Sequence, residues 1–146
     1  MSTEVNKNSI KLNGLFAFKE GMSTIYNEQG EAVPVTVLRY EPWVVSQLKT
    51  DEKDGYSAVQ IACRPKKAKN SSAAEVGHLK KAGMEVGAAF VREVRQSLPE
   101  GVNLGDQVGI DSVTKGDVVK LTGTSKGRGF QGSVRRFNFA GGPATH

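Results

Sequence analysis

The sequence lacks the residues that mark a secreted, disulfide-rich protein or a membrane protein. Its 146 residues include one cysteine, Cys63, which excludes an internal disulfide. Residues 1–12 are polar, and no apolar run reaches the roughly 18 residues that a membrane span needs. We therefore expect a cytoplasmic protein without a membrane partner.

Catalytic and metal-binding patterns are also missing. The 2 histidines, His78 and His146, match no zinc-ligand spacing with Cys63. Cys63 has no base at motif spacing, and no G-x-S-x-G nucleophile motif occurs. The sequence predicts neither an enzyme nor a cofactor, and no small-molecule substrate is expected.

Acidic residues are absent from residues 118–146, which carry five basic side chains. A second basic segment, residues 61–81, has six basic side chains and one acid, Glu75. Two mildly acidic segments alternate with these two basic ones. This distribution is typical of a protein with a polyanionic partner, most often nucleic acid. The alternative interpretation is that the two basic segments are simply solvated loops.

Short β-strands at roughly ten-residue spacing are predicted over the first part of the chain, which favours a barrel or sandwich. Glycine is frequent, with 17 residues, and several glycines fall at predicted turns. Residues 64–72 read as an exposed loop, residues 73–82 as a short helix ended by Gly83, and residues 51–55 as a charged turn. Strands are predicted at residues 14–19, 22–26, 33–37, 43–45, 56–63, 90–95 and 118–124.

Residues 127–132 match the G-x-G-x-x-G pattern of dinucleotide sites. Such a site needs a helix directly after the motif and an acid about twenty residues later. Here residues 133–139 alternate like a strand, and no acid follows. Nucleotide binding is therefore the alternative function of this segment. The leading interpretation is a flexible RNA-binding loop in which Lys126 and Arg128 neutralise phosphates.

Three phenylalanines near the end of the sequence, Phe130, Phe137 and Phe139, interleave with Arg135 and Arg136. Aromatic and guanidinium planes stack on unpaired bases in RNA sites. The same rings would equally suit the core of a hairpin, and the sequence leaves the two interpretations open.

Four ordered blocks of the sequence resemble the bacterial large-subunit ribosomal protein L-three family. The most specific reads GTSKGRGFQG at residues 123–132, followed by Arg135-Arg136 and by Pro143-Ala144-Thr145-His146. The others are the opening block from Gly14 to Val45, the KDGYSAVQ block at residues 53–60, and Gly77-His78-Leu79 with Lys81-Ala82-Gly83. Family members continue well past the last of these motifs, which predicts that this sequence is part of a longer chain.

The resemblance implies a mainly β fold: a translation-factor-type β-barrel with a short helix and a long, glycine-rich, basic extension, here without the closing C-terminal strands. It divides the chain into a polar leader at residues 1–13, a barrel body at 14–122 with a basic loop at 64–81, and the start of the extension at 123–146. It also implies a structural protein of the large ribosomal subunit. Such a protein binds ribosomal RNA near its 3′ end, promotes subunit assembly, contacts neighbouring ribosomal proteins and sends its extension toward the peptidyl-transferase centre.

The candidate RNA-binding residues are the basic, glycine and aromatic side chains of the two basic segments. They are Arg64, Lys66, Lys67, Lys69, His78, Lys80, Lys81, Lys126, Gly127, Arg128, Gly129, Phe130, Arg135, Arg136, Phe137 and His146. A free-standing barrel that binds some other polyanion is a third hypothesis.

Overall fold

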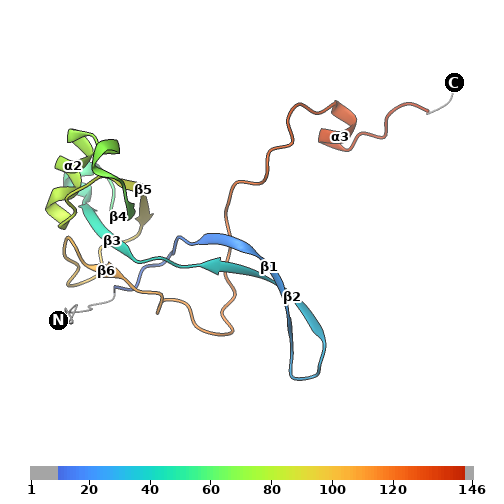
Figure 1. Ribbon diagram of the computed structural model, residues 1–146, viewed down its shortest axis with the longest axis horizontal. Helices are drawn as coiled ribbons and strands as arrows, with labels where there is room; N and C mark the ends of the chain where they lie inside the picture. Colours follow the sequence, from blue (N-terminus) through green and yellow to red (C-terminus); the bar gives the residue numbers. More distant parts are fainter. Residues whose placement is uncertain (1–9, 144–146) are drawn as a thin grey trace. The chain divides into compact units, whose positions relative to one another are not determined.

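The computed structural model describes residues 10–143 of the chain. The chain divides into two units, Met1–Lys115 and Gly116–His146. Both sheets belong to the first unit (Figure 1). His146, a candidate RNA-binding residue, lies outside the described residues.

The first sheet is a two-stranded antiparallel hairpin of β1 (Phe18–Tyr26) and β2 (Ala32–Arg39). The two strands predicted at residues 14–19 and 22–26 are replaced by one continuous strand with a bulge between Lys19 and Gly21. The two strands are joined by a turn at residues 27–30, in which the Asn27 side-chain oxygen accepts hydrogen bonds from the backbone amides of Gln29 and Glu31.

The second sheet is antiparallel with strand order β5-β4-β3-β6. Its strands are β3 (Trp43–Lys49), β4 (Ala58–Pro65), β5 (Ala88–Arg95) and β6 (Gln107–Val108). Val59, Ile61 and Cys63 alternate along β4 and are all buried, as the sequence pattern predicts.

The main core lies on this face of the second sheet. Trp43, Val45 and Ile61 are almost fully buried, and each such side chain contributes about 1.5–3 kcal/mol of burial free energy. The Trp43 indole donates a 3.0 Å hydrogen bond to the Phe16 carbonyl oxygen. Ile10 and Leu12, within the predicted polar leader, are also buried in this core.

Two short helices connect the strands of the second sheet. The predicted charged turn at residues 51–55 is a single helical turn, α1 (Asp51–Asp54). The predicted helix forms as α2 (Ala73–Leu79), continues as a 3-10 helix, η2 (Lys80–Ala82), and ends at Gly83, whose φ of 77° suits glycine. A further 3-10 helix, η1 (Ala68–Asn70), lies in the predicted loop.

The second unit differs from the sequence prediction. Residues 118–124 are not a strand, because none of residues 10–143 pairs with them in a sheet. The strand pattern at residues 133–139 is also wrong: the segment starts as a helix, α3 (Ser133–Phe137), in which the Arg136 amide donates to the Gly132 carbonyl oxygen.

The fold is mainly β, which confirms the predicted class. Within residues 10–143 the strands form two separate antiparallel sheets rather than a closed barrel. The division at residue 122 stays a prediction.

Candidate nucleic-acid interface

The basic loop of the first unit is held by a capped helix. The Ser72 hydroxyl accepts a hydrogen bond from the Glu75 amide, and the Glu75 carboxylate accepts one from the Ser72 amide. This capping box satisfies two of the free amides at the start of α2. Leu79 then packs against Ala62 and Ala88 of the second sheet, and Ala82 is also buried.

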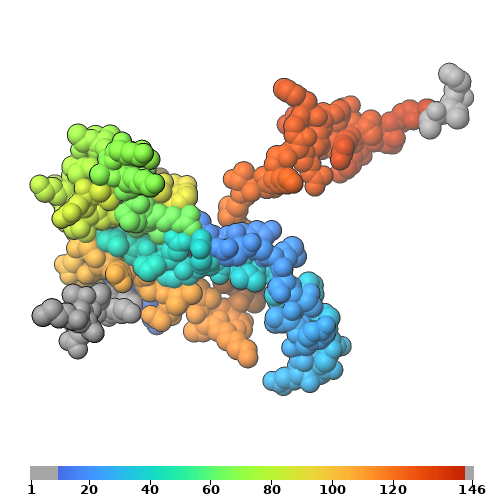
Figure 2. Space-filling view, viewed as in Figure 1, coloured from blue at the N-terminus to red at the C-terminus, as the bar shows by residue number. Residues whose placement is uncertain are grey.

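Four lysines in this loop project from its surface, and we call them the body lysines. They are Lys67, Lys69, Lys80 and Lys81, and all four are exposed. Lys80 and Lys81 lie between the buried Leu79 and Ala82, which orients η2 with its cations outward. Within residues 10–143 the body lysines form no ion pair, and their segment lies at the surface of the unit (Figure 2).

Lys66 differs from the body lysines because it already has a carboxylate partner. Its Nζ lies 2.6 Å from Glu75 Oε1. This contact, together with the backbone hydrogen bond from Ser72, lowers the pKa of Glu75 below its ordinary value. Lys66 therefore stabilises the start of α2 as well as contributing charge to the loop.

Arg64 also has internal partners. Its Nε and Nη2 atoms lie 2.7 and 2.6 Å from the two carboxylate oxygens of Glu41, and its guanidinium lies 3.9 Å from the centre of the Phe18 ring. Arg64 has a φ of 57°, an uncommon value for a residue with a side chain. The predicted exposed loop at residues 64–72 is wrong at its start, because Arg64 and Pro65 belong to β4.

His78 contacts a polar side chain of the sheet. Its Nε2 lies 2.6 Å from Gln60 Oε1, and the Gln60 amide nitrogen donates to Glu93. Ser46 Oγ also lies 3.0 Å from Gln60 Oε1, so Gln60 links His78, Ser46 and Glu93 in one polar network. Sequence reasoning missed Glu41, Gln60 and Phe18 as partners, since each is far along the chain from the residue it contacts.

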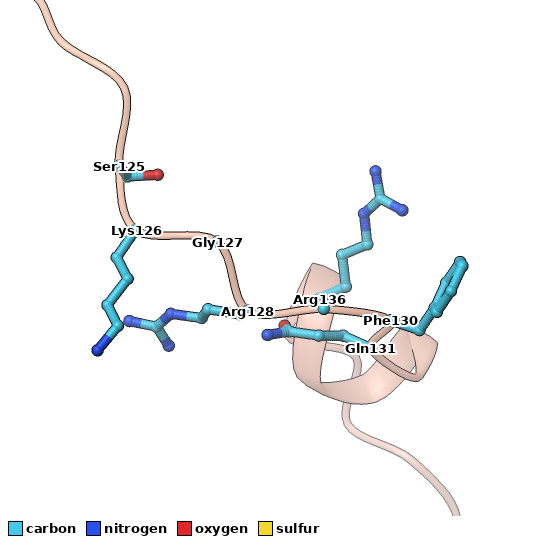
Figure 3. A pocket seen from close by; sticks show the side chains of 8 residues that line it. Ser125, Lys126, Gly127, Arg128, Phe130, Gln131 and Arg136 are labelled. Atoms are coloured by element: carbon cyan, nitrogen blue, oxygen red, sulfur yellow. The ribbon is translucent and has the colours of Figure 1, made fainter.

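The second unit carries four further predicted cations, and we call Lys126, Arg128, Arg135 and Arg136 the extension cations. A shallow hollow in this unit is lined by Lys126, Arg128 and Arg136 together with the backbone of Gly127 and Gly129. Figure 3 shows the Lys126 and Arg128 side chains on one side of the loop and the Phe130 ring on the other. Within residues 10–143 the extension cations form no ion pair.

None of the described residues of this unit is buried. Phe130, Phe137 and Phe139 are all exposed, so the interpretation of these rings as core residues of a hairpin is wrong. The Phe137 and Phe139 ring centres are 5.8 Å apart, and the Arg136 guanidinium lies 5.2 Å from the centre of the Phe137 ring.

The dinucleotide alternative gains no support from the glycine-rich segment. A helix does follow residues 127–132, against the sequence expectation, but α3 has only 5 residues. A dinucleotide site also needs a strand before the motif, and residues 116–126 contain none.

The described residues contain no group of three or more His, Cys, Asp or Glu side chains placed to hold a metal ion. Their helices are all too short or too polar to span a membrane.

The chain is similar along most of its length to known proteins, although no protein-family model matches it. It is 70% identical over 141 residues to the large ribosomal subunit protein uL3 of Bdellovibrio bacteriovorus, which covers 97% of this chain and 64% of that protein. It is 45% identical over 137 residues to uL3 of Desulfotalea psychrophila, covering 93% of this chain and 65% of the relative. It is 48% identical over 134 residues to uL3 of Leptospira biflexa, covering 91% and 64%. The chain thus spans a little under two thirds of the length of these curated relatives.

Proposed function

Because this chain belongs to the uL3 family of large ribosomal subunit proteins, we propose that it is a structural, non-enzymatic component of the large ribosomal subunit. Its place of action is then the ribosome in the cytoplasm, and its partners are ribosomal RNA and neighbouring ribosomal proteins. The relatives are named for the subunit, and the charge distribution of this chain fits an RNA partner.

The observation that carries RNA binding is that cations without carboxylate partners cluster in the two basic segments. The body lysines and the extension cations number eight, and none forms an ion pair within residues 10–143. A cation held away from carboxylates is available to a phosphate, and each phosphate it neutralises releases condensed counterions. Arg64 and Lys66 have internal carboxylate partners, so we assign them to holding the loop in place as well as to its basic surface.

Binding in this proposal depends on phosphate contacts and shape more than on reading bases. The loop at residues 125–131 has glycines at 127 and 129, whose small size lets backbone amides approach a phosphate closely. His78 and Phe130 lie at the surface of the two segments and complete the contact. The RNA is the region near the 3′ end of the large-subunit molecule, where binding helps nucleate assembly, and the extension is directed toward the peptidyl-transferase centre.

The test compares three charge-matched variants of the full chain on large-subunit ribosomal RNA. One changes the body lysines to Gln, a second changes the extension cations to Gln, and a third changes Lys11, Lys19, Lys53 and Lys115, which are exposed but outside both surfaces. Each variant removes four positive charges. The slope of log affinity against log salt is negative, and it should become shallower by about 3–4 units in the first two variants.

The third variant controls for net charge, and its slope should stay near that of the parent chain. Equal changes in all three slopes would contradict the assignment of these two surfaces. Unchanged slopes in the first two variants would contradict phosphate contact by their cations.

A further inference from the structure

The end of α3 presents aromatic rings to water in a setting that has no core. Phe137 is 60% exposed and Phe139 is 61% exposed. Asn138, between them, has a left-handed backbone with φ 57°, which ends the helix. This turn leaves the two rings in contact with each other, tilted by 32°, rather than against a sheet.

A guanidinium completes this group of side chains. The Arg136 guanidinium lies over the Phe137 ring, with 5.2 Å between its carbon and the ring centre. Such cation–π contacts hold the cation and ring in a defined arrangement. The Phe137 ring therefore has the Arg136 cation and the tilted Phe139 ring as neighbours, and the residue as a whole stays 60% exposed.

The charge around these rings selects the kind of ligand. Residues 118–146 carry five basic side chains and no acid. Their positive charge favours an anionic partner over an uncharged apolar one. A ligand with a negative backbone and flat apolar faces matches both features at once. In an RNA duplex the bases are stacked inside the helix, and its major groove is too deep and narrow for protein side chains to enter. Only an unpaired base can therefore reach such rings.

We propose that Arg136, Phe137 and Phe139 form a stacking platform for an unpaired base of ribosomal RNA. The inference rests on the proposed function, and it adds a base contact to phosphate binding by the extension cations. The base lies against the open ring surface while the Arg136 guanidinium contacts the adjoining ring or phosphate. Stacking of this kind accepts any base, because every base has a flat π-face.

The experiment uses the full chain with a short unpaired RNA that carries one 2-aminopurine, and with the same RNA fully paired. Variant one is the double change Phe137→Leu and Phe139→Leu, which keeps apolar volume and removes both rings. Variant two is Phe137→Trp, which keeps a stacking surface. The control is Val134→Ala, which removes an exposed apolar side chain of α3 that has no ring.

The parent chain should bind the unpaired RNA with a change in 2-aminopurine fluorescence. The double leucine variant should lose roughly 10- to 100-fold in affinity for the unpaired RNA and lose the fluorescence change. Its salt slope should stay the same, because all cations remain. Phe137→Trp and Val134→Ala should both bind the unpaired RNA like the parent chain.

Parent-like binding of unpaired RNA by the double leucine variant would overturn the platform, and so would an equal loss on paired RNA. Binding to anionic phospholipid vesicles is measured as well. If the double leucine variant lost binding to these vesicles alone, the rings would belong to a membrane contact, and this result would also overturn the platform. Failure of the parent chain to bind ribosomal RNA would overturn the proposed function itself, so the two failures are distinguishable.

Discussion

Arg64 and Glu41 form a two-point ion pair between residues 23 positions apart, with N–O distances of 2.7 and 2.6 Å. Arg39 also contacts Glu41, at 3.1 Å, and contacts Glu20 at 2.8 Å. These side chains connect the β1–β2 hairpin with β4. The Phe18 ring beneath the Arg64 guanidinium adds a cation–π contact to the same junction.

Glu41→Gln tests this junction through its pH dependence. The hydrogen bond from Arg64 lowers the pKa of Glu41, so its stabilisation is present above the ordinary glutamate pKa of about 4.3 and is lost as the pH falls through the lower folded value. The variant should have a lower Tm at pH 7 and a smaller further loss of Tm as the pH falls below about 4. Thermal unfolding followed by circular dichroism across this pH range measures both effects.

Glu28→Gln is the matched control for this experiment, since Glu28 is an exposed carboxylate in the hairpin turn. Asp54, Glu75 and Glu93 also have lowered pKa values because of their hydrogen bonds, so part of the acid sensitivity remains in every variant. Identical pH profiles for Glu41→Gln and the parent chain would contradict a stabilising ion pair.

Ser72→Ala removes the side-chain cap of α2. The loss should be about 1 kcal/mol in the free energy of unfolding, because the Glu75 amide is left without its hydrogen bond. Urea unfolding gives this value from the midpoint at constant slope. Thr50→Ala is the control, since Thr50 precedes α1 without a side-chain cap and should change the midpoint less. Equal losses at the two positions would show that capping does not stabilise α2.

Gly105→Ala should destabilise the body more than Gly101→Ala. Both glycines have positive φ, at 91° and 78°, so an alanine costs about 1–2 kcal/mol at either position. At Gly105 the new Cβ would also lie 3.3 Å from the Ala82 carbonyl oxygen, whereas Gly101 has open space around it. Urea midpoints of the two variants measure the difference, and a larger loss for Gly101→Ala would contradict the close approach.

The sequence correctly predicted those strands and helices whose local residue pattern is matched by a partner in the fold. The alternation of Val33, Val35 and Val37 forms β2, and the helix ended by Gly83 forms α2 and η2. The pattern at residues 118–124 looks equally strand-like, yet a strand needs a partner to accept its backbone hydrogen bonds. That requirement cannot be read from a local pattern, and none of residues 10–143 supplies a partner.

The candidate interface shows the same division between local and distant information. Clustering of charge identified both basic segments, because net charge is a property of the sequence itself. Which cations are already paired depends on contacts across the fold. Glu41 is 23 residues from Arg64. It lies between β2 and β3, whereas Arg64 lies in β4, so no spacing rule links the two.

Binding to ribosomal RNA across a salt series tests the central claim most directly. The full chain is titrated with the 3′ domain of large-subunit ribosomal RNA and with an unrelated duplex RNA. We predict a clear preference for the ribosomal domain that persists at about 0.2 M salt, where purely electrostatic binding has weakened by orders of magnitude. Equal and steeply salt-dependent binding to both RNAs would contradict the account and leave only a generic basic surface.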